Sequence, residues 1–286
     1  MSDPGAEFWV ASAALQRHRN RRASGDPGVD WLSHVRAHFL SPSLPRVLVV
    51  GGGGFIEKAL ARMPGTGIIL AVDSDVAAVE AAERRADLLG LSGVVHERCD
   101  PDADAVPPGP WNAVVVCGVL HHSADPEGLL RRLHDALASR GRLAFLEYVG
   151  PDRFRYPEQR MEIVRRFARL LPDRLRRSPV GGRVDGPSLL PDPEALARSR
   201  PNEAAKSAAL LAIARGVFTE EAVLPGSGGL LHPLLRGREE RFGRDPHGDE
   251  RVLSVLCAAE ADLAERGVLP DAFATFVGRR RGVGVG

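Results

Sequence analysis

The sequence predicts an α/β fold with a doubly wound, mostly parallel sheet and with helical additions at the N-terminus and after the fifth strand. Two observations carry this prediction. Between Val47 and Gly150, short and almost continuously apolar runs alternate with segments of helical periodicity, which is the pattern of strands joined by right-handed helical crossovers. The apolar runs lack regular polar alternation, as expected for strands buried on both faces of a sheet.

The elements are predicted in order along the chain. Residues 6–40 place apolar side chains at helical spacing on both sides of the break "SGDPG", and "SPSLP" is predicted to lead into the sheet. The core is then predicted as strands at 47–50, 67–73, 93–100, 111–120 and 142–149, with helices at 56–63, 76–89 and 126–138.

After Gly150 the pattern becomes more helical and richer in arginine. We predict helices at 157–177, 195–215 and 249–266, with a break at Pro201, strands at 217–224 and 272–280, a loop at 178–193 and a frayed tail at 282–286. These elements suggest three parts: an N-terminal helical cap at 1–45, a cofactor-binding core at 46–150, and a part at 151–286 that adds the last strands and shapes the substrate pocket.

Composition narrows the classes of partner. The 286 residues carry 38 Lys and Arg against 37 Asp and Glu, a net charge of +1, so there is no electrostatic case for nucleic acid or a membrane surface as partner. No secretory signal or membrane-length apolar run is visible, and the three cysteines show no metal-ligand pairing. We therefore expect a cytoplasmic protein that binds neither nucleic acid nor a membrane; its oligomeric state is left open, with a homodimer as one option.

Four glycines, residues 51–54, separate the first strand from the first helix of the core. A dinucleotide fingerprint would need a third glycine where Ile56 or Glu57 stands, and a P-loop would need Ser or Thr after Lys58, which alanine follows. The other common use of such a loop is to bind S-adenosylmethionine (SAM). Asp73, at the end of the second strand, is then expected to accept the ribose hydroxyls, with a helix N-cap as the alternative role.

The run "WNAVVVCGVLHHSADPEGLLRRLHDALASRGRLAFLEYVG" resembles the second half of a class I SAM-dependent methyltransferase core. The family often has an "LHH" segment after the fourth strand and a turn like "LASRGRL" before the fifth. With "VLVVGGGG", "AVDSD" and "ERCD", the resemblance covers about residues 46–150 and implies a Rossmann-like sheet. Outside it, "NRRASGDPGVDWL", "EYVGPDRF", "PNEAAKS" and "GGLLHPLL" resemble a bacterial subgroup of small-molecule methyltransferases with added helices.

The chain departs from the family at its first motif. Val49 stands where the family has an acidic residue that helps to orient the amino group of SAM, and Phe55 stands where the last glycine would be. Shifting the register by one residue keeps Gly52 and Gly54 but loses the first glycine. What replaces the missing carboxylate is therefore an open question.

The resemblance implies roles residue by residue. The expected cofactor-binding residues are Gly51, Gly52, Gly53, Asp73, Ser74, Asp100, Cys117, Gly118 and His121. Methyl transfer from a sulfonium requires alignment of the nucleophile, and an oxygen or nitrogen acceptor often requires a base. The catalytic candidates are His122, Tyr148 and His232, and the substrate-binding candidates are Arg22, Glu147 and Tyr148. Each of them has an alternative reading as a structural or exposed side chain.

We expect a metal-independent methyltransferase, because only Asp125 offers an acidic ligand near the fourth strand. The acceptor is expected to be an oxygen or nitrogen of a small metabolite, in specialised metabolism. The alternatives are an enzyme that cyclises or eliminates SAM and a non-catalytic binding protein on the same scaffold.

Overall fold

The computed structural model describes Trp9 and residues 11–176, 190–242 and 245–281. Contacts divide the chain into two compact units. We call Leu32–Asp152, Arg200–Leu224 and Ala274–Gly286 the sheet unit, and Met1–Trp31, Arg153–Ser199 and Pro225–Phe273 the helical unit. Each unit is described below by itself.

A seven-stranded sheet with the order β3-β2-β1-β4-β5-β7-β6 organises the sheet unit. Its strands are β1 (Leu44–Gly51), β2 (Thr66–Asp73), β3 (Val94–Arg98), β4 (Trp111–Cys117), β5 (Leu137–Tyr148), β6 (Thr219–Pro225) and β7 (Phe273–Arg279). The five strands β3-β2-β1-β4-β5 run parallel, and Val49 pairs with Ala71 of β2 and with Val115 of β4. The carboxyl ends of these strands therefore share one edge of the sheet, where ligands of doubly wound folds bind.

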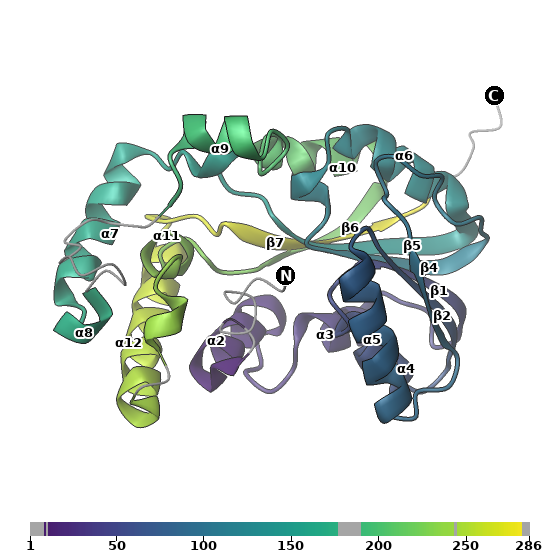
Figure 1. The fold of residues 1–286 in the computed structure, drawn as a ribbon, viewed down its shortest axis with the longest axis horizontal. Helices are drawn as coiled ribbons and strands as arrows, with labels where there is room; N and C mark the ends of the chain where they lie inside the picture. The colour runs from purple at the N-terminus through teal and green to yellow at the C-terminus, as the bar shows by residue number, and fades with distance from the viewer. Residues whose placement is uncertain (1–8, 10, 177–189, 243–244, 282–286) are drawn as a thin grey trace. The chain divides into compact units, whose positions relative to one another are not determined.

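Helices cover both faces of this sheet (Figure 1), with α6 and α10 on one face and α4 and α5 on the other. The helices of the unit are α3 (Trp31–His38), α4 (Ile56–Ala61), α5 (Val76–Leu88), α6 (Pro126–Ala136) and α10 (Leu210–Val217), with short 3₁₀ turns η1 (Leu120–His122) and η3 (Ser207–Ala209). Leu133 of α6 and Leu210 of α10 join Phe145 in the apolar core on the first face. The side chains of Asp75 and Asp125 cap α5 and α6, so both helices begin directly after the loops that follow β2 and β4.

The helical unit has its own apolar core. Its helices are α2 (Ala13–Ser24), α7 (Glu158–Leu170), α8 (Asp173–Arg176), α9 (Pro193–Ser199), α11 (Leu231–Leu235) and α12 (Pro246–Glu265), with 3₁₀ turns η2 (Asp152–Phe154) and η4 (Glu239–Arg241). Leu15, Val164, Leu234 and Leu253 bring α2, α7, α11 and α12 into one buried cluster.

The predicted fold class is confirmed, because the sheet is mostly parallel with flanking helices, and all seven predicted strands are present. Two predictions of local structure need correction: the fifth strand begins at Leu137 rather than at Arg142, and α11 was not predicted. The predicted break at Pro201 is confirmed, because α9 ends at Ser199 and the chain becomes helical again only at η3 and α10. The predicted loop at 178–193 and the tail lie mostly outside the described residues. Among the helices that the structure describes, none combines the length and apolar character needed to cross a membrane.

Candidate functional site

The glycine loop leaves β1 in a conformation that favours glycine. Residues Gly51 to Gly54 all have positive φ, at 74°, 89°, 57° and 84°, which side chains with a Cβ rarely adopt. A Cβ on Gly51 would lie 2.6 Å from the carbonyl oxygen of Cys117. The sequence therefore needs glycine here to let the backbone of β1 pass close to the end of β4.

A crevice of the sheet unit lies beside this loop. It is lined by Gly51, Gly53, Gly54, Glu57, Asp73 and His96, among others. Asp73 is half-buried, and its Oδ1 accepts a hydrogen bond from the backbone N–H of Asp75 at 3.0 Å. The side-chain cap of α5 is Asp75, so the capping role that the sequence leaves open for Asp73 belongs to its neighbour.

Glu57, the second residue of α4, places a carboxylate in this crevice. The side chain is almost completely buried, and its Oε1 lies 3.2 Å from Nε2 of His96 on β3. Its Oε2 is buried and has no hydrogen-bond partner among the described residues. Leaving such an oxygen unsatisfied costs about 1–3 kcal/mol, and a ligand with donor groups would satisfy it. The carboxylate therefore gives this crevice a hydrogen-bond acceptor that suits hydroxyl or amino groups, which SAM carries.

The other predicted cofactor residues lie at the carboxyl ends of β2, β3 and β4. Ser74 is exposed between Asp73 and the cap of α5. Asp100 follows β3, and its Oδ1 accepts from the N–H of Asp102 at 3.0 Å. Cys117 pairs in register with Gly51, and Gly118 is exposed with φ 70°. These positions agree with the strand ends from which the roles were predicted, while the roles themselves stay predictions.

A buried glutamate holds the turn after β4. Glu147 of β5 accepts hydrogen bonds from the N–H groups of Val119 at 2.7 Å and Leu120 at 3.0 Å, and its Oε2 lies 2.6 Å from Nδ1 of His121. Burial disfavours the charged carboxylate, but the His121 ring and the two N–H groups outweigh burial and hold the pKa of Glu147 below its ordinary value. In this structure Glu147 positions the turn and the His121 ring, and its carboxylate is enclosed; its predicted contact with a substrate stays a prediction.

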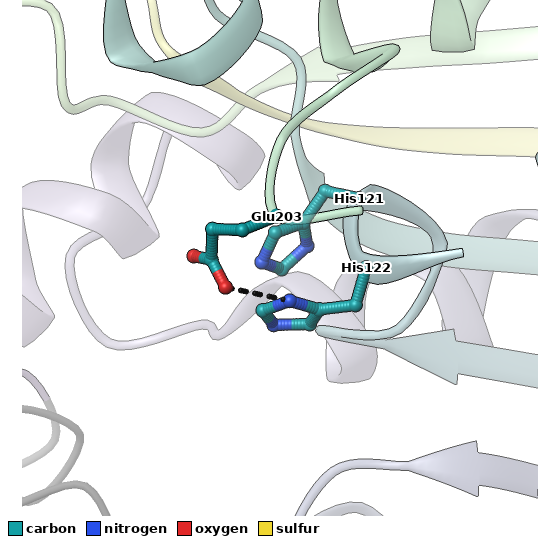
Figure 2. A group of neighbouring side chains, drawn as sticks. All are labelled: His121, His122 and Glu203. Carbon is teal, nitrogen blue, oxygen red and sulfur yellow. Dashed lines mark ion pairs between the residues drawn. The ribbon is translucent and has the colours of Figure 1, made fainter. Parts of the chain in front are cut away.

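The second histidine is held by a carboxylate from a distant part of the chain. Figure 2 shows His121, His122 and Glu203 gathered together, with Glu203 Oε2 at 3.0 Å from His122 Nδ1. Burial would lower the pKa of His122, but its hydrogen bond to Glu203 and the charges of Glu203 and Glu147 raise it above the ordinary value. Burial would raise the pKa of Glu203, but His122 and His121 together outweigh burial and lower it to about 2. The His122 side chain is 49% exposed and the Glu203 side chain 5%, so the imidazole remains open to a ligand.

The remaining candidates have partners of their own. Tyr148 is buried, and its hydroxyl donates to the carbonyl oxygen of Pro151 at 2.9 Å. Arg22 and His232 belong to the helical unit. There, Arg22 forms an ion pair with Asp271 at 2.6 Å, and His232 Nδ1 lies 2.7 Å from the hydroxyl of Tyr156. Their predicted contacts with a substrate stay predictions.

Two site residues were missed by sequence reasoning. Glu57 was noted only as a mismatch to the third glycine of the dinucleotide fingerprint, and that mismatch was the available signal. Glu203 lies in the segment "PNEAAKS", which was noted for its resemblance alone. Its pairing with His122 spans 81 positions, and no local pattern reports a contact of that range.

Comparisons with known proteins bear on this arrangement. Residues 48–143 match a family model described as a methyltransferase domain. Among curated proteins, no sequence matches the chain.

Three solved structures show a similar fold. A protein from Galdieria sulphuraria assigned as a sarcosine dimethylglycine methyltransferase has 11% identity and a TM-score of 0.55 over 87% of this chain and 84% of that one. Haemonchus contortus phosphoethanolamine N-methyltransferase 2, with phosphomonomethylethanolamine and S-adenosylhomocysteine, has 15% identity and a TM-score of 0.54 over 87% of this chain and 52% of that one. The [4+2]-cyclase SpnF has 17% identity and a TM-score of 0.52 over 87% and 79%. At these identities the structures support the fold alone.

Proposed function

We propose that the chain, whose residues 48–143 match a methyltransferase domain, is a class I SAM-dependent methyltransferase. The methyl group of SAM is transferred to an oxygen or nitrogen of a small metabolite, in specialised metabolism. The net charge of +1 supports a small acceptor over a nucleic acid.

The observation that carries the proposal is the placement of the paired histidines. Gly51 pairs with Cys117 where β1 and β4 end, and η1, with His121 and His122, begins three residues after Cys117. The glycine loop and the imidazoles therefore share one edge of the sheet. Glu147 holds the His121 ring and Glu203 holds the His122 ring. Both imidazoles are therefore positioned before any ligand binds.

The mechanism follows from what methyl transfer requires. SAM supplies an electrophilic methyl group on a sulfonium, and the acceptor atom must approach it in line. The glycine loop, Asp73 and Glu57 would hold the cofactor, and His122 with Glu203 would activate the acceptor at its hydroxyl or amino proton. Tyr148 and His232 stay catalytic candidates, and Arg22, Glu147 and Tyr148 stay candidates for binding the acceptor.

The test uses SAM labelled in its methyl group and a panel of small phenols, alcohols, hydroxy acids and amines. We expect label in one class of acceptor together with S-adenosylhomocysteine. His122→Asn is expected to lower kcat/KM about 10²–10⁴-fold, and His134→Asn on α6 serves as the matched control. Release of methylthioadenosine instead would favour the enzyme that cyclises or eliminates SAM. Failure to bind either SAM or S-adenosylhomocysteine in calorimetry would favour a non-catalytic protein.

A further inference from the structure

We propose that His121, His122 and Glu203 form a binding site for one divalent transition-metal cation, with zinc as the reference ion. The inference rests on the proposed function for its catalytic meaning, because it names what activates the acceptor, but the binding of the cation can be tested alone. It replaces the expectation of a metal-independent enzyme. That expectation rests on the lack of clustered acidic ligands near the fourth strand, whereas two of the three groups here are imidazoles.

The three donor groups lie close enough to be gathered by one ion. One candidate ligand atom from each residue lies within 4.8 Å of the other two. Figure 2 shows the side chains converging from the turn after β4 and from residues 201–207, which we call the Glu203 segment. Zinc bonds to imidazole nitrogen and carboxylate oxygen at about 2.0–2.2 Å, so the groups need to close by about an ångström. The half-exposed His122 ring can make that movement, because it is the least enclosed of the three.

The site has the outer support that metal-binding histidines usually have. Nδ1 of His121 is engaged by Glu147 at 2.6 Å, which leaves Nε2 as the nitrogen for a ligand. Glu147 is itself fixed by the N–H groups of Val119 and Leu120. A carboxylate on the far nitrogen fixes the tautomer and direction of a ligating imidazole, so His121 is oriented as a ligand would be.

The Glu203 segment is attached to the histidine turn by the backbone. The N–H of Ala204 donates to the carbonyl oxygen of His121 at 2.7 Å, and Nζ of Lys206 donates to the carbonyl oxygen of Ala124 at 2.7 Å.

The charges around the site also favour a cation. Two buried carboxylates, Glu147 and Glu203, lie beside the two imidazoles. Arg200, whose side chain is 60% exposed and 3.5 Å from Glu203, is a permanent cation near them. A divalent ion would balance the two buried negative charges.

The donor set selects the class of metal. Two imidazoles and one carboxylate suit zinc, iron, cobalt, nickel or manganese, whereas magnesium and calcium prefer oxygen ligands throughout. Three protein ligands leave coordination positions open, and an acceptor hydroxyl fits one of them. The bound hydroxyl would lose its proton to solvent more readily. Its oxygen would then form a bond to the methyl carbon as the carbon–sulfur bond breaks, with that electron pair moving to sulfur. His122 would then act as a ligand, and the acceptor class narrows to oxygen compounds.

The experiment measures metal binding to the full chain after treatment with a chelator. Zn²⁺, Co²⁺, Mn²⁺ and Mg²⁺ are titrated separately by calorimetry and by competition with a chelating dye. We expect one Zn²⁺ per chain with a dissociation constant in the micromolar range or below, a visible absorption band for Co²⁺, and no competition by Mg²⁺. Glu203→Gln and His122→Asn should each weaken Zn²⁺ binding at least tenfold, and Glu220→Gln, in the same unit, should leave it unchanged.

Two results would overturn the proposal: no stoichiometric binding of any transition metal at micromolar concentration, or Zn²⁺ binding that is equally tight in Glu203→Gln. Retained affinity for S-adenosylhomocysteine in each variant shows that the domain is folded. If metal binds at this site but no acceptor is methylated in the panel, the proposed function fails and the metal site stands. If methylation proceeds equally in metal-free and zinc-loaded protein, the cation has no catalytic role.

Discussion

At the scale of single residues, the unusual feature is the position of the carboxylate near the glycine loop, which comes from α4 instead of β1. The strand position of Val49 holds no acidic group, yet Glu57 brings a buried carboxylate to the same glycine loop from α4. Its unsatisfied Oε2 is the atom most in need of a donor in that crevice. The family's acidic residue and Glu57 reach the loop from different elements, so a contact of Glu57 with the cofactor need not involve the same cofactor atom.

We predict that Glu57→Gln weakens the binding of S-adenosylhomocysteine about tenfold, which corresponds to about 1.4 kcal/mol. The amide retains the shape of the side chain but replaces a charged acceptor with a weaker one. Calorimetry gives the affinities, and Glu97→Gln, at an exposed position on β3, is the control. An unchanged affinity would mean that a bound water, rather than the cofactor, satisfies Oε2.

A second residue-scale prediction concerns the backbone of the loop. Gly51→Ala should lower the free energy of unfolding by about 1–3 kcal/mol. The new Cβ would lie too close to the carbonyl oxygen of Cys117, and the backbone φ of 74° is one that alanine rarely adopts. It should also abolish the binding of S-adenosylhomocysteine. Gly53→Ala has a smaller expected effect, about 1 kcal/mol, since the nearest atom to its Cβ is 4.0 Å away. Urea denaturation compares the two, and equal losses would contradict the account.

At the scale of elements, Glu147 is what joins β5 to the turn after β4. Glu147→Gln is predicted to destabilise the protein by about 2–4 kcal/mol. The amide oxygen can still accept from the N–H groups of Val119 and Leu120, but the amide N–H₂ then replaces the carboxylate oxygen that faces His121, and the negative charge is lost. The loss is measured as the shift in urea midpoint at pH 7. Glu220→Gln, which removes a partly exposed partner of Arg215, should shift it by no more than about 0.5 kcal/mol. Similar shifts in both variants would show that Glu147 is not holding the turn.

The elements also show what the sequence can and cannot predict. Buried parallel strands such as "VLVV" and "NAVVVC" are predictable because apolar character persists along them. The start of β5 was not, since "LASRGRL" has the composition of a turn while its backbone already lies in the strand from Leu137. In the site, strand ends located Asp73, Cys117 and His122 correctly on the sheet edge. The pairings of Glu57 with His96 and of Glu203 with His122 depend on tertiary contacts that leave no periodic trace.

At the scale of the whole molecule, both units use the same device. In the sheet unit Glu147 collects two N–H groups and His121. In the helical unit Glu260 of α12 accepts from the N–H groups of Gly228, Leu230 and Leu231, and its Oε1 lies 2.8 Å from Nε2 of His18. Each glutamate is buried and satisfied by one imidazole and a run of backbone donors. Such a group stabilises the unit only while it is charged.

This predicts a steep loss of stability in acid. Burial opposes the charge of Glu260, but His18 and the backbone donors lower its pKa below the ordinary value. His121 and the backbone N–H groups lower the pKa of Glu147 in the same way. The pKa of Glu203 is lowered to about 2. A carboxyl group with a depressed pKa in the folded state stabilises the protein above its unfolded pKa, about 4.3, and loses that contribution as the pH falls. Each such group adds up to about 1.4 kcal/mol per pH unit to the slope. Asp271, whose pKa is raised by burial, acts in the opposite direction and limits the total.

The measurement is the urea midpoint between pH 7 and pH 2.5. The free energy of unfolding should decline modestly from pH 5 to pH 7, because the pKa of His122 is raised and its stabilising contribution is lost as the pH rises. Below pH 5 it should fall continuously toward pH 2.5. In Glu260→Gln the curve should start lower at pH 7 and fall less steeply below pH 4.5, because one of the titrating groups is gone. Glu265→Gln, an exposed position on the same helix, should reproduce the slope of the unchanged protein. A slope in Glu260→Gln as steep as in the control would show that the buried glutamate does not couple proton binding to folding, and would leave the exposed carboxylates as the source of acid sensitivity.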